Sequence, residues 1–414
     1  MIIGVSGPVD LRLLEWDLKE TNLPATNAFP LTSHFINGLL RRGYKVIAYT
    51  NSTELEEPLV LESGNLKVCV GRQRPQPGRR FFNFEIEDLK NLMLAHPADF
   101  ISAFWTYEFA WAALKTGIPT AVSIHDNAHK ILFQQPDMFR FVRWIMNKIV
   151  LKKADHLMAN SAYTYSLLGR KQKAKAVTIN NFYASDLESS LNRNAEKGNY
   201  IVSAIQGFTK RKNVHGALFA FAKLRERYPD LEYHLVGLEM EENGLAHQFA
   251  RKHNLDAGVR FIGVLPFNEV FQHIAGAKVL LHPSYEESFG MAVLEAMVAG
   301  TPVVGGKNSG FVPHLLNYGK AGLLCDIKSP DSMAGSVAKL LSDRSLREEI
   351  VQNARTHAQS NFSEPVVIDK HLAFYSKILG KELEPSPVSA APTRVNITGT
   401  SWSLMAYVSS LLIP

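Results

Sequence analysis

Two acidic residues, Glu287 and Glu295, stand eight positions apart in the segment EESFGMAVLEAMVAGTPVV. The preceding run AKVLLHPS is typical of a strand that leaves a hydrophobic core, and MAVLEAMVAG has the apolar spacing of a helix. Gly300 and Pro302 are the signals that end this helix. One carboxylate therefore precedes the helix and the other lies inside it, where the two can bond separate hydroxylated groups of one ligand.

The residues at the predicted start of this helix, Ser288, Phe289 and Gly290, form a candidate phosphate site. A helix N-terminus exposes unpaired N–H groups and carries about half a positive charge. Gly290 has no Cβ, so its backbone can approach an anion closely. Because a carboxylate would repel phosphate, we expect Glu287 to contact hydroxyl groups instead. A nucleotide sugar, with hydroxyls on both sides of a diphosphate, has the matching layout.

Short apolar runs alternate with helical patterns along most of the chain, which predicts parallel sheets with crossover helices. The expected strands are MIIGV, KVIAYT, FISAF, TAVSIHD, HLMAN and AVTIN, followed by NYIVSAI, EYHLVG, VRFIG, AKVLLHP, TPVVGG and GLLCD. A polar, turn-rich segment, 184–199, separates the two series and predicts a linker. In such sheets, ligands bind at the carboxyl ends of the strands.

The segment HPSYEESFGMAVLEAMVAGTPVV resembles, along its whole length, the E-x7-E region of retaining nucleotide-sugar glycosyltransferases of family 4, also called glycosyl transferase group 1. The resemblance extends to about residue 380, through IVSAIQGFTKRKNVHGALFAFAKL and KKADHLMANSAYTYSLL. It implies an α/β protein of the GT-B fold, with two Rossmann-like parallel-sheet domains facing across a cleft. The expected parts are an acceptor-side domain, a linker, a nucleotide-sugar-binding domain, a C-terminal helix packing back towards the first domain and a flexible tail: 1–183, 184–199, 200–363, 364–383 and 384–414.

The resemblance assigns roles to the positions that match the family pattern. Glu287 would bind hydroxyls of the donor sugar and Glu295 the ribose, while Lys212 would hold the diphosphate and His125 would lie near the reacting centre. The predicted catalytic residues are Glu287, His125 and Lys212. The predicted donor-binding residues are Gly207, Lys210, Arg211, Lys212, Val264, Ser288, Phe289, Gly290 and Glu295.

Three positions depart from the family pattern. Phe208 stands where an arginine usually follows the glycine of the phosphate loop, and His314 stands where an acid usually follows proline. The glycine pair of the first acceptor-domain loop is matched only approximately, by Gly4 and Gly7. These departures motivate an alternative, a non-catalytic nucleotide-sugar-binding relative that acts as a partner of another enzyme. A dinucleotide-dependent dehydrogenase is disfavoured because no G-x-G-x-x-G follows an early strand. A phosphorylase of related fold would need pyridoxal phosphate and usually a much longer chain.

The expected reaction moves a hexose from a nucleotide sugar, most simply a UDP- or GDP-sugar, to a saccharide or lipid-linked acceptor, in polysaccharide or glycolipid biosynthesis. The family retains the anomeric configuration, so we expect front-face attack assisted by the leaving phosphate. Lys212, a neighbouring cation and the helix N-terminus would stabilise the charge that grows on the diphosphate. No Asp-x-Asp element stands at a strand end, so we expect no metal and no other cofactor.

The composition of the chain predicts its cellular compartment and the kind of partner that it binds. The two cysteines, Cys69 and Cys325, fit a reducing cytoplasm, and the start of the chain lacks the features of a signal peptide. The formal charge of +6 favours anionic partners. The basic stretches 71–80 and 169–176, with helix 137–151, predict either contact with anionic lipid at the inner face of the membrane or a solvated basic face. No nucleic-acid-binding module is recognised, so no nucleic-acid partner is expected.

Overall fold

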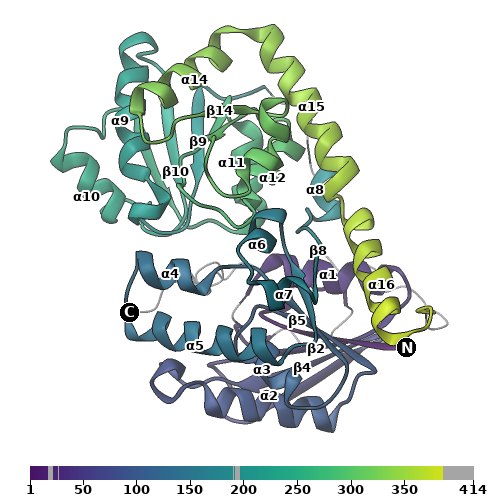
Figure 1. Cartoon of the computed structure of the whole chain (residues 1–414). Coiled ribbons are helices and arrows are strands. Elements are labelled where there is room, and N and C mark those ends of the chain that lie inside the picture. Colours follow the sequence, from purple (N-terminus) through teal and green to yellow (C-terminus); the bar gives the residue numbers. More distant parts are fainter. Residues whose placement is uncertain (17–21, 27, 190, 192–195, 386–414) are drawn as a thin grey trace. The chain divides into compact units, whose positions relative to one another are not determined.

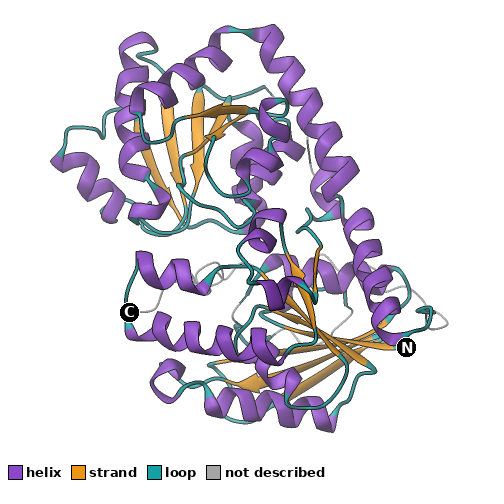
Figure 2. Ribbon diagram, in the orientation of Figure 1, coloured by secondary structure: helices purple, strands orange, loops and turns teal. Residues whose placement is uncertain are grey.

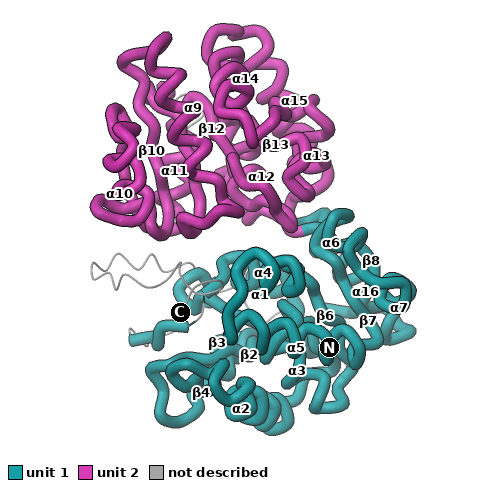
Figure 3. The backbone as a smooth tube through the Cα atoms, turned by 60° about the vertical axis from the view of Figure 1, so that its left-hand side comes forward, with its two compact units in different colours: residues 1–180, 364–414 teal, residues 181–363 magenta. Residues whose placement is uncertain are grey.

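The computed structural model of this chain divides into two compact α/β units, coloured separately in Figure 3. Unit 1 holds Met1–Asn180 and the segment that begins at Glu364, and unit 2 holds Asn181–Ser363. The structure describes residues 1–16, 22–26, 28–189, 191 and 196–385. Part of the predicted linker and all but the first two residues of the predicted tail lie outside the described residues.

Unit 1 is built on an eight-stranded sheet with the order β3-β4-β2-β1-β5-β6-β7-β8. All neighbouring strands pair in parallel except β3, which runs antiparallel to β4 at the edge of the sheet. The strands are β1 (Ile2–Ser6), β2 (Lys45–Ser52), β3 (Leu59–Ser63), β4 (Leu66–Arg72), β5 (Phe100–Phe104), β6 (Thr120–Ile124), β7 (His156–Ala159) and β8 (Ala176–Thr178).

Helices pack around this sheet, as Figures 1 and 2 show. The inner strands β1, β5 and β6 are almost wholly buried and apolar, which is what a parallel sheet with covered faces requires. The helical elements of unit 1 are η1 (Leu11–Leu13), α1 (Pro30–Arg41), η2 (Pro77–Arg80), α2 (Asn83–Ala95), α3 (Glu108–Leu114), α4 (Ala128–Gln134), α5 (Met138–Lys153), α6 (Ala162–Ser166), α7 (Arg170–Lys173) and α16 (Glu364–Leu379).

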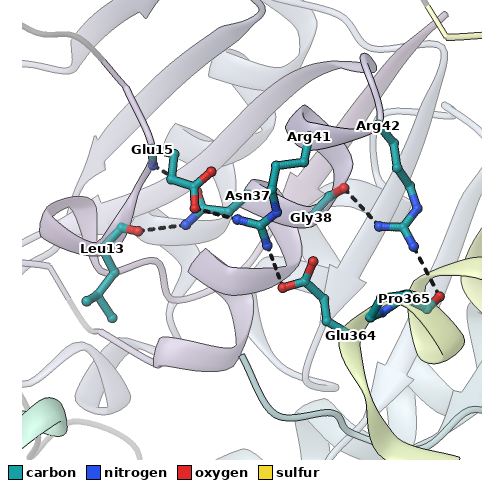
Figure 4. A network of polar contacts seen from close by, with 8 residues as sticks. All are labelled: Leu13, Glu15, Asn37, Gly38, Arg41, Arg42, Glu364 and Pro365. Carbon is teal, nitrogen blue, oxygen red and sulfur yellow. Dashed lines mark hydrogen bonds and ion pairs between the residues drawn. The ribbon is translucent and has the colours of Figure 1, made fainter. Parts of the chain in front are cut away.

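The last of these helices, α16, is joined to the rest of unit 1 by polar contacts with α1 (Figure 4). The Arg41 guanidinium bonds both Glu15 and the buried Glu364 carboxylate, and Arg42 Nη2 donates to Pro365 O at 3.1 Å. Further along the helix, the Tyr375 hydroxyl donates to Ser102 Oγ at 2.6 Å. The segment after Ser363 therefore completes the core of unit 1, although most of the intervening chain belongs to unit 2.

Unit 2 is built on a six-stranded sheet, all parallel, with the order β11-β10-β9-β12-β13-β14. The strands are β9 (Tyr200–Ala204), β10 (Glu232–Val236), β11 (Val259–Gly263), β12 (Val279–His282), β13 (Val303–Gly306) and β14 (Leu323–Cys325). The helical elements are α8 (Ser185–Ser189), η3 (Lys210–Lys212), α9 (Val214–Arg227), α10 (Leu245–Lys252), α11 (Phe267–Gly276), α12 (Met291–Ala299), α13 (Val312–Leu315), η4 (Asn317–Gly319), α14 (Pro330–Ser342) and α15 (Arg344–Phe362).

The predicted class, two parallel-sheet α/β units, is confirmed, and every strand predicted from the sequence is present. The sequence analysis missed the antiparallel pair β3–β4 at the edge of the first sheet. Within the described residues, no helix combines the length and apolar character that crossing a membrane would need.

Candidate functional site

The predicted site residues Lys212 and Glu287 meet at the carboxyl edge of the sheet of unit 2. Lys212 ends η3, which follows β9, and Glu287 lies in the loop between β12 and α12. Lys212 Nζ donates to Glu287 Oε1 at 2.7 Å. His282, the last residue of β12, places Nε2 3.4 Å from the same oxygen. A lysine, a carboxylate and a histidine thus form one buried cluster, at the edge where parallel sheets bind ligands.

Electrostatics keeps the Glu287 carboxylate ionised although the cluster is buried. Burial alone would raise the pKa of Glu287, but the Lys212 ammonium and the His282 ring outweigh it, and the pKa lies well below its usual range. Burial lowers the pKa of Lys212, while the Glu287 carboxylate acts in the opposite direction. Glu287 is therefore an ionised acceptor at neutral pH, suited to sugar hydroxyls, and Lys212 is a partly desolvated donor beside it.

A neighbouring residue, Asn213, fixes the loop that carries Lys212. Asn213 has φ +52° and ψ +32°, the left-handed conformation that asparagine tolerates better than most residues. Its buried amide nitrogen donates to Pro283 O at 3.2 Å and to Ile327 O at 2.8 Å. These bonds connect the loop after β9 to the loops after β12 and β14. Asn213 is a positioning residue that the sequence analysis missed.

A second loop, which follows β13, fixes the backbone of Glu287. Phe311 N donates to Glu287 O at 3.0 Å, and Ser309 Oγ donates to Ser284 O at 2.6 Å. Between them, Gly310 has φ +61°, and a Cβ on it would lie 2.2 Å from Glu287 O. Only glycine allows this close approach. In the sequence, the dipeptide Ser309–Gly310 predicts a turn, but it does not predict that this turn lies against Glu287.

The helix after Glu287 begins as the sequence predicts. Gly290, with φ +104°, is the N-cap of α12, and as a glycine it has no side chain that could bond the first N–H groups of that helix. Phe289 is buried and stacks on Phe311 with 5.2 Å between ring centroids, which anchors the turn. Ser288 lies directly before it. The N-terminus of α12 therefore lies a few residues after Glu287, and its first N–H groups are of the kind that bind anionic groups.

Glu295 lies inside α12 with only 3% of its surface exposed. Within the described part of the chain, no hydrogen bond or ion pair of its carboxyl group is found. Burial raises its pKa to about 7. A buried carboxyl group without a protein partner costs free energy unless a ligand bonds it. This is the arrangement expected of a group that receives the hydroxyls of a bound molecule.

The predicted phosphate loop after β9 holds the remaining donor-binding candidates. Gly207 has φ +85° and donates its N–H to Leu238 O at 3.2 Å. Arg211 Nη1 donates to Glu286 O at 3.1 Å, so this cation lies beside the Glu287 loop, whereas Lys210 is exposed. Val264 directly follows β11 at the same edge of the sheet and is half-buried.

Two of the residues that depart from the family pattern, Phe208 and His314, pack against aromatic rings. The ring of Phe208 lies 4.2 Å from His215 and 5.5 Å from Phe249, centroid to centroid, over the helices α9 and α10. His314 stacks on Phe311 at 5.5 Å. Phe208 thus stands in place of the usual cation, and its ring extends the hydrophobic core.

His125 belongs to unit 1, where it follows β6. Its ring packs against Phe104 and Trp105, with centroids 5.4 Å and 4.6 Å away. Both ring nitrogens are buried and lack a hydrogen-bond partner among the described residues. Burial lowers its pKa to about 3, with the His371 ring adding to the effect. The imidazole is therefore neutral at pH 7.

His282, like Trp105, was not among the site residues predicted from the sequence. The 3.4 Å approach to Glu287 places His282 in the cluster instead. The sequence feature that could have identified His282 is its position at the carboxyl end of a strand, five residues before Glu287. No group of three or more His, Cys, Asp or Glu side chains suited to a metal ion is found in the described ranges.

Comparison with known protein families decides between the α/β classes that share this architecture. Residues 31–186 match the family described as Glycosyltransferase Family 4, and residues 188–357 match the family described as Glycosyl transferases group 1. The chain belongs to this glycosyltransferase family. The second match includes Lys212, Glu287 and Glu295, so the clustered residues lie in the part that carries the family pattern.

Individual relatives agree with this assignment. A glycogen synthase of Mycobacterium tuberculosis is 30% identical over 176 residues, 42% of this chain and 42% of that protein, so the match spans less than half of that curated relative. Sucrose-phosphate synthase from Thermosynechococcus elongatus has a similar fold, with a TM-score of 0.70, 19% identity and coverage of 92% of this chain and 99% of that one. Anabaena HepE, crystallised with UDP-glucose, gives a TM-score of 0.64, 18% identity and coverage of 91% and 99%. The predicted GT-B fold is confirmed.

Proposed function

We propose that this protein is an enzyme that transfers a hexose from a nucleotide sugar to a saccharide or lipid-linked acceptor, with retention of configuration. The observation that carries the proposal is the buried Lys212–Glu287–His282 cluster beside the N-terminus of α12. Cleavage of a nucleotide sugar places negative charge on the departing diphosphate. The proposed site offers that charge an ammonium and a helix N-terminus.

The acids have separate roles in this proposal. Glu287, ionised and held by Lys212, accepts hydrogen bonds from hydroxyls of the donor sugar. Glu295, buried and without a protein partner in the described residues, accepts those of the ribose. When the diphosphate binds, Lys212 is shared between Glu287 and the phosphate oxygens. This sharing favours the transition state, in which the phosphate charge is larger than in the ground state.

We assign the acid–base work to the substrates and to neutral groups. Glu287 is engaged by Lys212 and His282 and is not placed as a nucleophile, so we propose that the leaving phosphate takes the acceptor proton during front-face attack. His125 is neutral and can donate or accept one hydrogen bond, but it supplies no positive charge at pH 7. We propose that it orients the acceptor or the donor sugar. We further propose that the reaction needs no metal.

The nature of the donor is inferred from relatives. HepE was crystallised with UDP-glucose, and the curated relatives include synthases of glycogen and other glycosyltransferases. A UDP- or GDP-hexose is therefore the first donor to test, and polysaccharide or glycolipid synthesis in the cytoplasm is the first pathway class to consider.

Peripheral contact with a membrane is proposed from unit 1. Three large apolar side chains on α4 and α5 are exposed: Phe133 at 85%, Met138 at 73% and Phe141 at 42%. Exposed lysines, Lys152 and Lys153, end α5. A helix with exposed apolar side chains at one end and basic ones at the other suits the headgroup region of a bilayer with anionic lipid. We propose that this face, defined by α4 and α5, meets the membrane where a lipid-linked acceptor is presented.

The enzymatic proposal is tested by measuring sugar release and transfer from UDP-, GDP- and ADP-hexoses, with wild type and Glu287→Gln. We expect Glu287→Gln to lower kcat by about 100-fold or more, because a neutral amide accepts sugar hydroxyls more weakly and no longer balances Lys212. The wild-type rate should survive EDTA, and product NMR should show the anomeric configuration of the donor. Equal rates for the two proteins, once both are shown to be folded by circular dichroism, would contradict the role of Glu287.

A further inference from the structure

Unit 2 contains a pocket of about 730 Å³ at the edge of its sheet opposite to the Lys212–Glu287 cluster. It lies where β9, β12 and β13 begin, between the end of α9 and the first half of α15. Its volume is in the range of sites that enclose small molecules, about 300–1,000 Å³. Neither the family matches nor the proposed reaction gives this pocket a role.

The lining is rich in cations. Its five basic side chains are Lys197, Arg227, Lys278, Arg347 and Arg355. In the described ranges of the chain, no ion pair joins Lys197, Arg227 or Lys278 to a carboxylate. Lys197 Nζ donates to Ala275 O at 2.5 Å and to Thr301 Oγ1 at 2.8 Å, and Lys278 Nζ donates to Asn199 Oδ1 at 2.7 Å. These acceptors are neutral, so they do not balance the positive charge.

The two acidic residues of the lining compensate little of this charge. Glu348 accepts a hydrogen bond from Arg344 Nε at 2.7 Å, so its charge is already balanced by a residue outside the lining. Asp230 is exposed and has no ion pair among the described residues. The pocket therefore keeps a positive excess, which an anionic ligand would neutralise.

Among the lining residues, Lys197 gives the strongest argument for a bound anion. Burial and, to a smaller extent, the nearby Arg355 guanidinium lower the pKa of Lys197 to about 8. An ammonium group has three N–H donors, and two of them are used by the acceptors named above. One donor of Lys197 is thus left beside a second cation. A bound phosphate would accept from it and relieve the repulsion between the two positive groups.

Most of the uncharged residues of the lining are apolar. Tyr228, Leu231, Pro302 and Val351 form part of the wall beside the cations. Arg227 lies with its guanidinium 5.5 Å from the centroid of the Tyr228 ring. Such a wall favours a ligand that combines an anionic group with a ring, over a free inorganic anion.

We propose that this pocket is a second ligand site, which binds a phosphorylated small molecule with a sugar or nucleoside ring. The ligand's phosphate lies among Lys197, Lys278 and Arg355, and its ring lies against Tyr228. Gly300, which ends α12, also lines the pocket, so the ligand contacts the far end of the helix that carries Glu295. The proposal does not depend on transferase activity.

Hydrogen–deuterium exchange tests the proposal, because it reports where a ligand binds. The probes are glucose 1-phosphate and inorganic phosphate, added to wild type and to Lys212→Ala, which removes the cation of the donor site. We expect glucose 1-phosphate to slow exchange in 197–199, 227–231 and 347–355 in both proteins. Because of the ring, inorganic phosphate should need about a tenfold higher concentration for the same effect.

Variants of the pocket make the test specific. The double variant Arg227→Gln/Lys278→Gln should weaken the protection by about tenfold or more, since Lys278→Gln removes a charge-assisted contact to the phosphate and Arg227→Gln removes part of the positive charge around it. The matched control is Lys339→Gln, because Lys339 is an exposed lysine on α14 outside the lining and should leave the protection unchanged. Absence of protection in wild type at millimolar glucose 1-phosphate would overturn the proposal. Protection that persists in the double variant would overturn it equally.

Discussion

The Glu287 carboxylate explains why three different side chains converge in unit 2. Lys212 at 2.7 Å and His282 at 3.4 Å both approach its Oε1 atom, and the Lys212 ammonium and the His282 ring hold the pKa of Glu287 low despite burial. A buried ion pair of this kind is weak evidence for stability, because desolvation opposes its Coulombic gain. It is better explained as preorganisation, in which a cation and an acceptor are held in place before the ligand arrives.

The buried carboxyl group of Glu295 predicts how the free energy of unfolding depends on pH. Its pKa is about 7 in the folded protein and near 4.5 in an unfolded chain, so the folded state holds the proton more strongly. The free energy of unfolding should therefore fall as pH rises from about 5 to 8, by about 3 kcal/mol from this group alone. Glu295→Gln should remove this decline, as measured by urea unfolding across that pH range.

The control for this experiment is Glu349→Gln, an exposed glutamate on α15, which should keep the wild-type slope. An unchanged slope in Glu295→Gln would show that the carboxyl group is not protonated by burial. Nucleotide binding gives a second readout. If ribose hydroxyls bond the Glu295 carboxylate, binding near pH 7 should release protons, which calorimetry in buffers of different ionisation enthalpy detects.

At the scale of residues, the sequence predicted those that stand in a distinctive pattern. It did not predict an individual residue that joins the site through a contact in space. Glu287, Glu295 and Lys212 were predicted because they stand in segments that resemble the family over many positions. His282 was not predicted as part of the cluster, because a histidine that ends a strand is usually a packing residue. Its approach to Glu287 depends on the path of the loop between them, which spacing does not determine.

The elements that hold the site are short. Specific contacts from neighbouring residues, not the length of these elements, hold their loops in place. The segment η3 has three residues, and α12 has nine. Asn213 ties the first of these to two other loops, and the Gly310 loop holds the backbone beside the second. The donor site therefore depends on residues that do not touch a ligand.

Asn213→Ala tests this dependence. The change removes two buried hydrogen bonds to carbonyl groups and places alanine in a left-handed conformation, so we expect a loss of about 2–3 kcal/mol in unfolding free energy. Nucleotide-sugar binding should weaken as well, because Lys212 is the adjacent residue. Asn213→Gly separates the two causes, since glycine relieves the backbone strain but not the lost bonds. Wild-type affinity and stability in Asn213→Ala would show that the loop is held by other contacts.

Strands were predictable at the element scale because the inner strands are short, apolar and buried on both faces. The hairpin β3–β4 was missed for a physical reason. Val60, Glu62 and Ser63 give β3 a partly exposed, polar pattern, and only the two-residue Gly64–Asn65 turn indicates the pairing. An edge strand of that kind carries little of the hydrophobic signal on which the other predictions relied.

At the scale of the whole molecule, the chain leaves unit 1 after Asn180 and returns to it at Glu364. The returning helix is fixed by a partly buried ion pair, Arg41 to Glu364, and by the Tyr375–Ser102 bond inside the core. Pairing of residues more than 270 positions apart cannot be derived from local patterns. It was expected only because the chain resembles a family with a C-terminal helix in this role.

The proposed membrane face of unit 1 also belongs to this scale. We expect wild-type protein to sediment with vesicles of phosphatidylglycerol and less with vesicles of phosphatidylcholine. The triple variant Phe133→Ser/Met138→Ser/Phe141→Ser should lower the partition coefficient by about tenfold or more, since each apolar side chain contributes about 1.5 kcal/mol or more when buried. Leu245→Ser, which alters an exposed residue of unit 2, is the matched control. Equal partition of wild type and triple variant would exclude this face as the contact.

The most direct test of the proposed donor site is calorimetric titration with UDP-, GDP- and ADP-hexoses of wild type, Lys212→Ala and Lys252→Ala. Lys252 is an exposed lysine that ends α10, away from the cluster, and serves as the control. We predict micromolar binding of one nucleotide sugar to wild type and Lys252→Ala, and a loss of about 100-fold in affinity in Lys212→Ala, because a buried charge-assisted contact to the diphosphate is removed. Equal affinity in all three folded proteins, or no binding of any nucleotide sugar to wild type, would contradict the assignment of this cluster as the donor site.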